Sequence, residues 1–500
     1  MPRWMPIGVV VLATALPCRA AQPPEKPILE TWDASYLEGS RAGFVRTATY
    51  ELDQGGKKFL RTIVEMQLSV KKFKQVIQLR GQVGNDEAPD GTVLSTFMRQ
   101  GIGQKKDLTI VGIVKGKQLE LLIDGKSGVL QPAPWDDRAV GLYRQQSLLA
   151  DRKVKPGDKF NFLSFEPTVN LLVRMDVTVK DFEEVSVPGA KSRSKLLRVE
   201  LVPEKLEGVE LPKLTQWLDE DLKLVRQDTE IPGLGQMTLV RTTREVALAP
   251  GAEATLTDIG ISQLIRLNRT VSKPYETRSA VYRITIKGDD DAATAFVQDD
   301  RQKVINSKGS TFDLQVTATK APQKTVSGGK VADEFLQSCY FITSDDAKVK
   351  ELARRAVGKE TTPLKKALLI EKWVHTNMRS TGAEALSPAS EVARNLEGDC
   401  TEYAMLMAAM CRAEGVPSKT AIGLIYADTK SGPAMAFHMW TEVWVGGQWL
   451  PLDATLGKGY VGATHLKVTD HSWHDTRALT PLLPLIRVLG KMQVEIVSAQ

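Results

Sequence analysis

The sequence predicts a multidomain protein with a β-rich N-terminal region followed by an α+β C-terminal domain. The chain has 500 residues. A single hydrophobic core rarely supports a chain of this length, so two or three domains are expected. From about Ile28 to Leu248 hydrophobic and polar residues alternate with the period of a β-strand. After Gly329 the hydrophobic residues recur at helical spacing, and strand-like segments return further on. This order is typical of an α+β domain.

Residues 1–21 have the pattern of a secretory signal peptide. Arg3 supplies a positive charge, Met5 to Pro17 is an apolar run, and Ala20 and Ala21 offer small residues for cleavage. The run is too short to span a bilayer, and no other apolar stretch is long enough for a transmembrane segment. A buried N-terminal element is the alternative. We expect the mature protein to be secreted or periplasmic.

Residues 27–249 are predicted to form the first β-rich domain. Turn signals such as Gln54-Gly55-Gly56 and Pro156-Gly157 separate the alternating segments. This pattern predicts an antiparallel sheet, a sandwich or a partly closed barrel. The expected strands include Leu108–Val114, Leu119–Ile123, Leu196–Leu201 and Trp217–Arg226. We find no nucleophile or metal cluster here, so the region is interpreted as a scaffold or recognition module.

Residues 257–328 are predicted to form a smaller β-rich connecting module, after a linker of small and polar residues at 249–255. Tyr282–Ile286 and Phe312–Val316 have strand patterns. The acidic run from Asp289 to Asp291 is expected to be a solvated turn.

Residues 331–500 are predicted to form the C-terminal α+β domain. Ser344 is expected to cap a first helix, Thr362 and Pro363 to start a second, and Ser387-Pro388 to open a short third one. A further helix is expected from Cys400 to Glu414, ended by Gly415. Strands are then expected at Thr420–Tyr426, Phe437–Val445 and Gln448–Asp453.

The cysteines indicate a nucleophile rather than a disulfide framework. After the leader, Cys339, Cys400 and Cys411 remain. Cys400 and Cys411 lie about 16 Å apart along one predicted helix, too far for a disulfide. Cys400 falls in the first turn of that helix, where the dipole favours a thiolate. A buried hydrophobic role, expected for Cys339 and Cys411, is the alternative for Cys400.

A candidate base follows from one predicted hairpin. Gly446-Gly447 between two strand patterns indicates a two-residue turn that pairs Val445 with Gln448. In that register His438 and Asp453 are diagonal neighbours on one face, within reach of a side-chain hydrogen bond. An aspartate that orients a histidine beside a nucleophile is the arrangement of a catalytic triad.

Several segments resemble the transglutaminase-like superfamily, in its bacterial secreted form. The similarity covers roughly Asp333 to Gly457 and rests on three blocks in order, with a helix-ending motif between the first two: Gly398–Ala404, Arg412–Pro417, Phe437–Val443 and Leu452–Thr455. The resemblance implies a papain-like fold in which Cys400 is the nucleophile, His438 the general base and acid, and Asp453 the orienting residue. It further implies a thioester acyl-enzyme on peptide, isopeptide or glutamine-type amide bonds, with no cofactor.

Other candidates carry weaker signals. Trp440 and Trp444 share the predicted face of His438 and are candidates for substrate binding, with a buried packing cluster as the alternative. No metal site is expected, because a solvated loop is the favoured reading of His465, His471 and His474.

The expected partners follow from charge and from the resemblance. The net charge of +6 comes from 66 basic and 60 acidic residues without a basic run, so nucleic acid is not an expected partner. The expected substrate is a protein or peptide, and a cell-envelope polymer is a further candidate. Hydrolysis is favoured over crosslinking. The rival interpretation is a catalytically silent binding or structural protein that uses its β-rich region.

Overall fold

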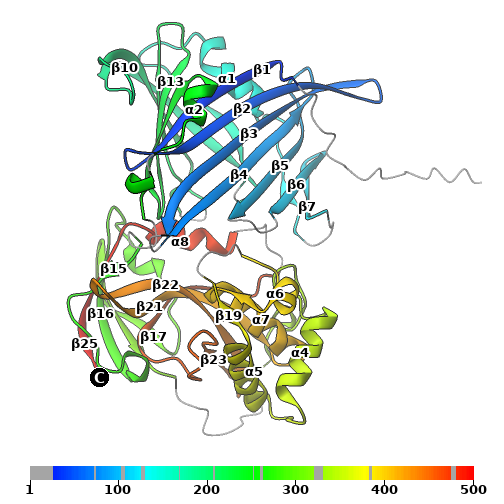
Figure 1. Ribbon diagram of the computed structural model, residues 1–500, viewed down its shortest axis with the longest axis vertical. Helices are drawn as coiled ribbons and strands as arrows, with labels where there is room; N and C mark the ends of the chain where they lie inside the picture. The colour runs from blue at the N-terminus through cyan, green and yellow to red at the C-terminus, as the bar shows by residue number, and fades with distance from the viewer. Residues whose placement is uncertain are drawn as a thin grey trace, which may run out of the picture.

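The computed structural model describes residues 26–72, 75–102, 107–125, 130–167, 169–206, 209–251, 253–258, 263–319, 330–381, 386–474 and 480–500. The signal peptide expected at residues 1–21 lies outside these ranges. Within them, none of the helices is both long enough and apolar enough to cross a membrane. Figure 1 shows a large curved sheet at one end of the molecule and an α+β region at the other.

The N-terminal region is one antiparallel sheet of 14 strands, in the order β8-β7-β6-β5-β4-β3-β2-β1-β14-β13-β12-β11-β10-β9. The predicted β-rich architecture is therefore confirmed. Neighbouring strands in this order are also consecutive in the chain, except β1 and β14, whose pairing joins the two meanders. The strands are β1 (Leu29–Leu37), β2 (Ser40–Gln54), β3 (Lys57–Lys72), β4 (Gln75–Glu87), β5 (Val93–Ile102), β6 (Leu108–Lys115), β7 (Gln118–Ile123), β8 (Ala133–Pro134), β9 (Lys159–Glu166), β10 (Leu171–Val185), β11 (Ser194–Pro203), β12 (Leu214–Leu218), β13 (Leu224–Ile231) and β14 (Gly235–Thr242).

The two edges of this sheet approach each other. After β8, Ala139 forms an isolated bridge with Leu163 of β9, and the Val140 N–H donates to the Leu163 carbonyl at 2.8 Å. The helix α1 (Leu142–Asp151) follows directly. The sheet is therefore partly closed, and its concave side carries a separate hydrophobic cluster around Phe162, Val177 and Leu197. The short helix α2 (Arg244–Leu248) ends the region.

One expected strand is wrong: Trp217–Arg226 is not continuous. The chain turns between β12 and β13, and the Asp219 Oδ1 atom accepts hydrogen bonds from the N–H groups of Asp221 and Lys223. Leu222 has a positive φ of 60°. An aspartate that bonds nearby backbone N–H groups stabilises a turn locally, and the residues on both sides continue the alternation, which hid the turn.

Strands of the predicted connecting module share a sheet with the last strand of the chain. The order of this four-stranded sheet is β17-β18-β16-β25, with β16 (Ser279–Ile286), β17 (Gln302–Lys308), β18 (Thr311–Thr317) and β25 (Met492–Ala499). One hydrophobic cluster joins residues of this sheet to Leu424 and Leu466 of the C-terminal region. The boundaries at 27–249, 257–328 and 331–500 stay predictions.

In the acidic run after β16, Asp290 and Asp291 are exposed in a turn, as expected, whereas Asp289 is half-buried and forms an ion pair with Arg487. The Arg487 Nη2 atom donates to Asp289 Oδ1 at 3.0 Å and to the Asp291 carbonyl at 2.7 Å. Asp289 and Arg487 are 198 residues apart, so no local pattern could pair them.

The C-terminal region has the predicted α+β architecture. The helix α7 packs against a sheet ordered β15-β22-β21-β24, with β23 paired to β22, and α4, α5 and α6 pack around α7 (Figure 1). The helices are α4 (Ala347–Val357), α5 (Pro363–Asn377), α6 (Ala389–Asn395) and α7 (Cys400–Ala413), and a shorter one, α8 (Leu483–Val488), precedes β25. The strands are β15 (Ile265–Arg266), β19 (Arg379–Ser380), β20 (Glu397–Gly398), β21 (Ser418–Thr429), β22 (Gly432–Val445), β23 (Gln448–Leu452) and β24 (His465–His471).

The start of the first of these helices is a second correction. Asp346 rather than Ser344 is the N-cap of α4, and its carboxylate accepts from the N–H groups of Lys348 and Val349. Ser344 is buried two residues earlier, with 6% of its surface exposed. Ser and Asp are both favoured N-caps, so composition alone did not separate the two positions.

Candidate active site

Cys400 is the first residue of α7, and a capping box fixes this start. The Asp399 carboxylate accepts from the Thr401 N–H at 3.0 Å, and the Glu402 carboxylate accepts from the Asp399 N–H at 3.0 Å. These two bonds satisfy N–H groups that a helix start leaves without partners. The Cys400 side chain is half-buried and lies where the helix dipole is positive.

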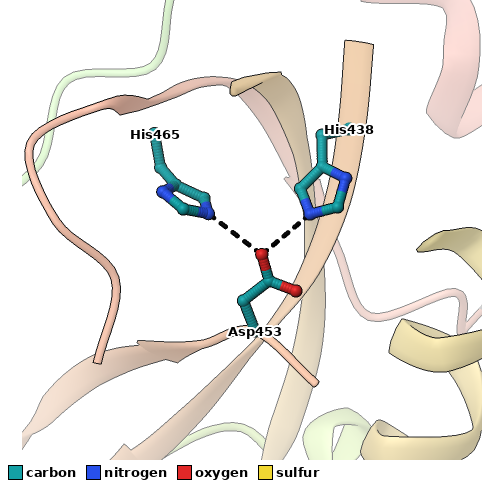
Figure 2. A group of neighbouring side chains, drawn as sticks. All are labelled: His438, Asp453 and His465. Atoms are coloured by element: carbon teal, nitrogen blue, oxygen red, sulfur yellow. Dashed lines mark hydrogen bonds and ion pairs between the residues drawn. The ribbon is translucent and has the colours of Figure 1, made fainter. Parts of the chain in front are cut away.

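His438 and Asp453 meet across the predicted hairpin. Val445 pairs with Gln448 around Gly446-Gly447, where both glycines have positive φ, 65° and 82°, as a type I′ turn requires. His438 lies on β22, and Asp453 directly follows β23. Their side chains are joined by a hydrogen bond of 2.8 Å from His438 Nε2 to Asp453 Oδ2 (Figure 2). The predicted register and the predicted bond are confirmed.

Charge and burial act strongly on this pair. Only 8% of His438 and 2% of Asp453 are exposed. Burial raises the pKa of Asp453, but the charge and hydrogen bond of His438, together with those of His465, lower it well below its usual range. Burial opposes the charged form of His438, yet Asp453 and Cys400 together raise its pKa well above the usual value. The site therefore favours an imidazolium beside an ionised carboxylate.

The same arrangement brings Cys400 to His438. A side-chain hydrogen bond with Cys400 is among the causes that raise the His438 pKa. A carboxylate only accepts hydrogen bonds, so His438 Nε2 carries the proton of the bond to Asp453. Nδ1 is then the ring nitrogen that remains for the thiol. Side chains from α7 and from the segment after β23 therefore both act on His438 of β22.

His465 is the residue that sequence reasoning missed. It does not lie on a solvated loop: it is the first residue of β24, has 0% of its surface exposed, and its Nε2 lies 3.0 Å from Asp453 Oδ2. Burial lowers its pKa to about 4, so near neutral pH the ring is uncharged and Nε2–H donates to Asp453. The alternation of Leu466 and Val468 with His465 and Lys467 was the available signal for a strand here.

His465 is held from the other side by Arg301. The Arg301 Nη2 atom donates to the carbonyls of Gly462 and His465 at 3.1 and 3.4 Å. Arg301 lies between β16 and β17, in the segment predicted to be a connecting module. That segment therefore supports the site directly, through the backbone on which His465 lies.

The atoms of this group have a spacing that could hold a metal ion. In the described ranges His438, Asp453 and His465 each offer one ligand atom, all within 4.8 Å of one another. These three atoms are joined by two N–H···O hydrogen bonds, one from each histidine to Asp453 (Figure 2). His471 lies at the other end of β24 and accepts a hydrogen bond from the Trp473 N–H at 2.8 Å, so it does not join them.

The two candidate substrate-binding tryptophans occupy different environments. Trp440 is buried, with 1% exposed, and its ring lies 6.4 Å from His438 and 5.4 Å from His465. Trp444 is half-buried and packs against Trp449 at 5.4 Å. Trp440 thus packs beside the histidines, and a role of either tryptophan in substrate binding stays a prediction.

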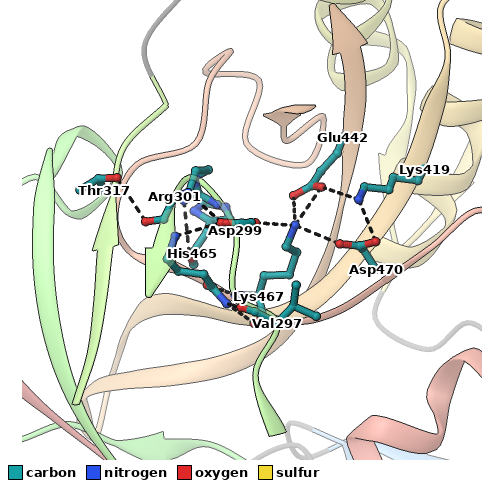
Figure 3. Close-up of polar contacts among 10 residues, drawn as sticks. Val297, Asp299, Arg301, Thr317, Lys419, Glu442, His465, Lys467 and Asp470 are labelled. Carbon is teal, nitrogen blue, oxygen red and sulfur yellow. Dashed lines mark hydrogen bonds and ion pairs between the residues drawn. The ribbon is translucent and has the colours of Figure 1, made fainter. Parts of the chain in front are cut away.

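A buried network of charges anchors β24 (Figure 3). The Lys467 ammonium lies 3.0 Å from Glu442 and Asp470 and 2.6 Å from Asp299, and both Lys467 and Glu442 are 2% exposed. Lys419 bridges Glu442 and Asp470 at 3.5 and 2.8 Å. These contacts tie β24 to β22, to β21 and to the segment before β17, two residues from His465.

The comparison with known families identifies this region. Residues 350–454 match the family model described as the transglutaminase-like superfamily. The chain therefore contains a transglutaminase-like superfamily domain, as the sequence blocks indicated. Cys400, His438 and Asp453 all fall inside the matched residues, whereas His465 lies beyond them.

Individual relatives are distant. A protein of Haemophilus influenzae described as uncharacterized is 32% identical over 108 residues, which is 21% of this chain and 29% of that protein. A candidate cysteine protease from Cytophaga hutchinsonii has 16% identity over 45% of this chain and 85% of its own, with a TM-score of 0.30. A β-barrel-like domain of unknown function from Brucella abortus has 12% identity over 43% of this chain and 95% of its own, with a TM-score of 0.31. TM-scores of this size do not indicate a shared overall fold.

Proposed function

We propose that the C-terminal domain is a thiol enzyme acting on peptide, isopeptide or glutamine-type amide bonds. Cys400 is the nucleophile, His438 the general base and acid, and Asp453 the orienting residue. The observation that carries the proposal is the 2.8 Å hydrogen bond between His438 and Asp453. Cys400, at a helix start, is among the groups that raise the pKa of His438.

The chemistry follows from these positions. His438 Nδ1 holds the proton that the Cys400 thiol has given up, and the sulfur of Cys400 attacks the carbonyl carbon of the amide. The Cys400 N–H, in the first turn of α7, is a candidate donor to the developing oxyanion. His438 then gives its proton to the leaving amine, the C–N bond breaks and a thioester remains. Water, deprotonated by His438, attacks the thioester carbonyl carbon, and the C–S bond breaks. The acid is released, and the Cys400 thiolate is restored beside the protonated His438.

Hydrolysis is favoured over crosslinking, because a crosslinker must bind an amine and exclude water. The substrate is proposed to be a protein or peptide. A cell-envelope polymer is a further candidate, in keeping with the secreted or periplasmic location that we propose. None of these steps requires a cofactor. Trp444, half-buried on the same strand as His438, is the better placed of the two tryptophans to contact substrate.

The experiment compares the mature protein with Cys400→Ala on a panel of amide substrates, with and without a primary amine. Cys339→Ala is the matched control, because Cys339 is also a free, half-buried cysteine. Mass spectrometry should find a thioester adduct in the parent and in Cys339→Ala but not in Cys400→Ala, with acid as the main product. If the folded parent forms neither adduct nor product across the panel, the thiol-enzyme proposal fails. The result would then favour a binding or structural protein that uses its β-rich region.

A further inference from the structure

A large cavity lies in the N-terminal region, where the concave side of the sheet meets α8. Its volume is about 550 Å³, and its walls come from α1, from strands β9 to β13 and from α8. Figure 1 shows α8 between the large sheet and the rest of the molecule. A single water needs only ~10–15 Å³, whereas sites for small molecules occupy ~300–1,000 Å³. The cavity therefore has the size of a ligand site.

The walls of this cavity are mostly aliphatic. They include Leu148, Met175, Leu201 and Leu214 from the N-terminal region and Ile486 and Leu489 from the C-terminal segment. Protein interiors are normally close-packed with few large voids. A hydrocarbon gains free energy by moving from water into contact with such walls.

The few polar groups in the walls already have partners. Gln145 donates to Ser164 Oγ at 3.1 Å and to the Val140 carbonyl at 2.7 Å. Gln216 donates to Gln227 at 2.8 Å, and the fifth polar wall residue, Glu166, also has an interaction partner. A peptide would bring one backbone donor and one acceptor per residue, each of which needs a partner when buried. The walls therefore suit an alkyl chain better than a peptide.

A second cavity adjoins the first and is polar at its rim. It has a volume of about 540 Å³ and shares residues such as Leu211 and Leu489 with the first. Its charged lining residues are three lysines and three glutamates, Lys205, Lys213, Lys491, Glu38, Glu210 and Glu230. This balance offers hydrogen bonds to a polar group without favouring either sign of charge.

We propose that the N-terminal region binds a single-chain amphiphile. The alkyl chain occupies the aliphatic cavity between the sheet and α8, and the polar head lies in the adjoining cavity. This binding site is separate from the proposed thiol site, and neither proposal depends on the other.

The test is a fluorescence titration of the mature protein with 11-(dansylamino)undecanoic acid. The variants Met175→Trp and Leu214→Trp place a larger side chain in the cavity, and thermal melting checks that both are folded. Val246→Trp is the matched control, since Val246 is 51% exposed on α2 and does not line the cavity. We expect saturable binding that weakens at least about tenfold in both cavity variants and stays unchanged in Val246→Trp and in Cys400→Ala.

Competition then identifies the ligand class. Unlabelled n-alkyl carboxylates and n-alkanols of eight to sixteen carbons should displace the probe more strongly as the chain lengthens, and equally for the two heads at one chain length. Absence of saturable binding, equal binding by the cavity variants and the parent, or displacement independent of chain length would overturn the proposal. Displacement by carboxylates alone would overturn the assignment of the head to a charge-balanced cavity.

Discussion

His465 donates its Nε2–H to Asp453 Oδ2 at 3.0 Å, the same oxygen atom that His438 contacts at 2.8 Å. The other oxygen, Oδ1, accepts from the Thr455 N–H at 2.9 Å. The carboxylate is thus held by three donors, and its plane and position are fixed before any substrate binds. Hydrogen bonds that fix the position of an orienting residue act on reactivity indirectly, because they fix the orientation of the group that this residue contacts.

The contribution of His465 can be measured by substitution. His465→Leu removes the donor, and we expect kcat to fall about 10–100-fold with KM little changed. His465→Asn keeps a side-chain N–H and should recover part of the loss. A steady-state comparison of the two variants, with melting temperatures as a check on folding, decides the point. Equal activity of the leucine variant and the parent would show that His465 only fills space.

Removing the orienting carboxylate should lower activity more than removing His465 does. Asp453→Ala is expected to lower kcat by about 10²–10⁴-fold, because the imidazole of His438 loses its partner and its tautomer is no longer fixed. We expect the fold to survive, and circular dichroism should show an unchanged spectrum. Kinetics that match the parent enzyme would remove Asp453 from the triad.

The His438–Asp453 pair predicts a pH window of stability. The folded pKa of Asp453 lies below its ordinary 3.8, so its contribution is complete above that pH and is lost on acidification through the lowered value. The folded pKa of His438 lies above its ordinary 6.5, so its contribution is complete below pH 6.5 and is lost as the pH rises through the raised value.

Urea unfolding of Asp453→Asn and its parent, both in a Cys400→Ala background, tests this window. The difference in unfolding free energy should be largest between about pH 4 and 6.5 and should shrink at higher pH. A difference that is constant from pH 4 to 10 would mean that the pair is not ionised in the folded protein.

Glu402, in the capping box of α7, should make the folded protein less stable as the pH rises, whereas Asp453 stabilises it above its lowered pKa. Burial and the nearby Asp399 raise its pKa from 4.5 to about 7. The folded state then binds this proton more tightly, so stability falls as the pH rises from 4.5 to 7, by at most about 3 kcal/mol. Glu402→Gln should flatten this part of the stability curve. Glu351→Gln is the control, because that side chain is 55% exposed, and it should leave the curve unchanged.

The charge network under β24 should be sensitive to the loss of one partner. Lys467→Met leaves the Glu442 carboxylate buried, and we expect a loss of about 3–5 kcal/mol in unfolding free energy. The double variant Lys467→Met/Glu442→Leu should recover part of this loss. Lys223→Met, at a lysine that is 74% exposed, should stay within about 0.5 kcal/mol of the parent. Equal effects of Lys467→Met and Lys223→Met would mean that water reaches the network.

Local signals predicted the parts of the site that depend on short stretches of chain. The helix start at Cys400 was predicted, although its cap by Asp399 and Glu402 was not, and the Gly446-Gly447 turn predicted the register that brings His438 to Asp453. The alternating pattern also predicted the large N-terminal sheet. The helix start, the hairpin register and the individual strands are each decided by neighbouring residues, within about fifteen positions, whereas the pairing of β1 with β14 joins distant segments.

Contacts between distant segments were not predictable in this way. His465 reaches Asp453 because β24 pairs with β21, forty residues earlier in the chain, where His465 lies opposite Ile425. The Arg301 bond to the His465 carbonyl spans 164 residues. The turn at Asp219 was missed for a different reason, because alternation continues on both sides of it. The alternation of apolar and polar residues indicates which face of the sheet a side chain lies on. It does not indicate where one strand ends and the next begins.

The pairing of β16 with β25 has a consequence for synthesis. Residues 279–286 have no partner on one edge until residues 492–499 have left the ribosome, and this sheet shares a hydrophobic cluster with β21 and β24. A nascent chain therefore carries its thiol on a helix long before the strand that supports Asp453 can be held in place. Such long-range pairing forms slowly, so this sheet, and the cluster that it shares with β21 and β24, should be completed only after residues 492–499 are available.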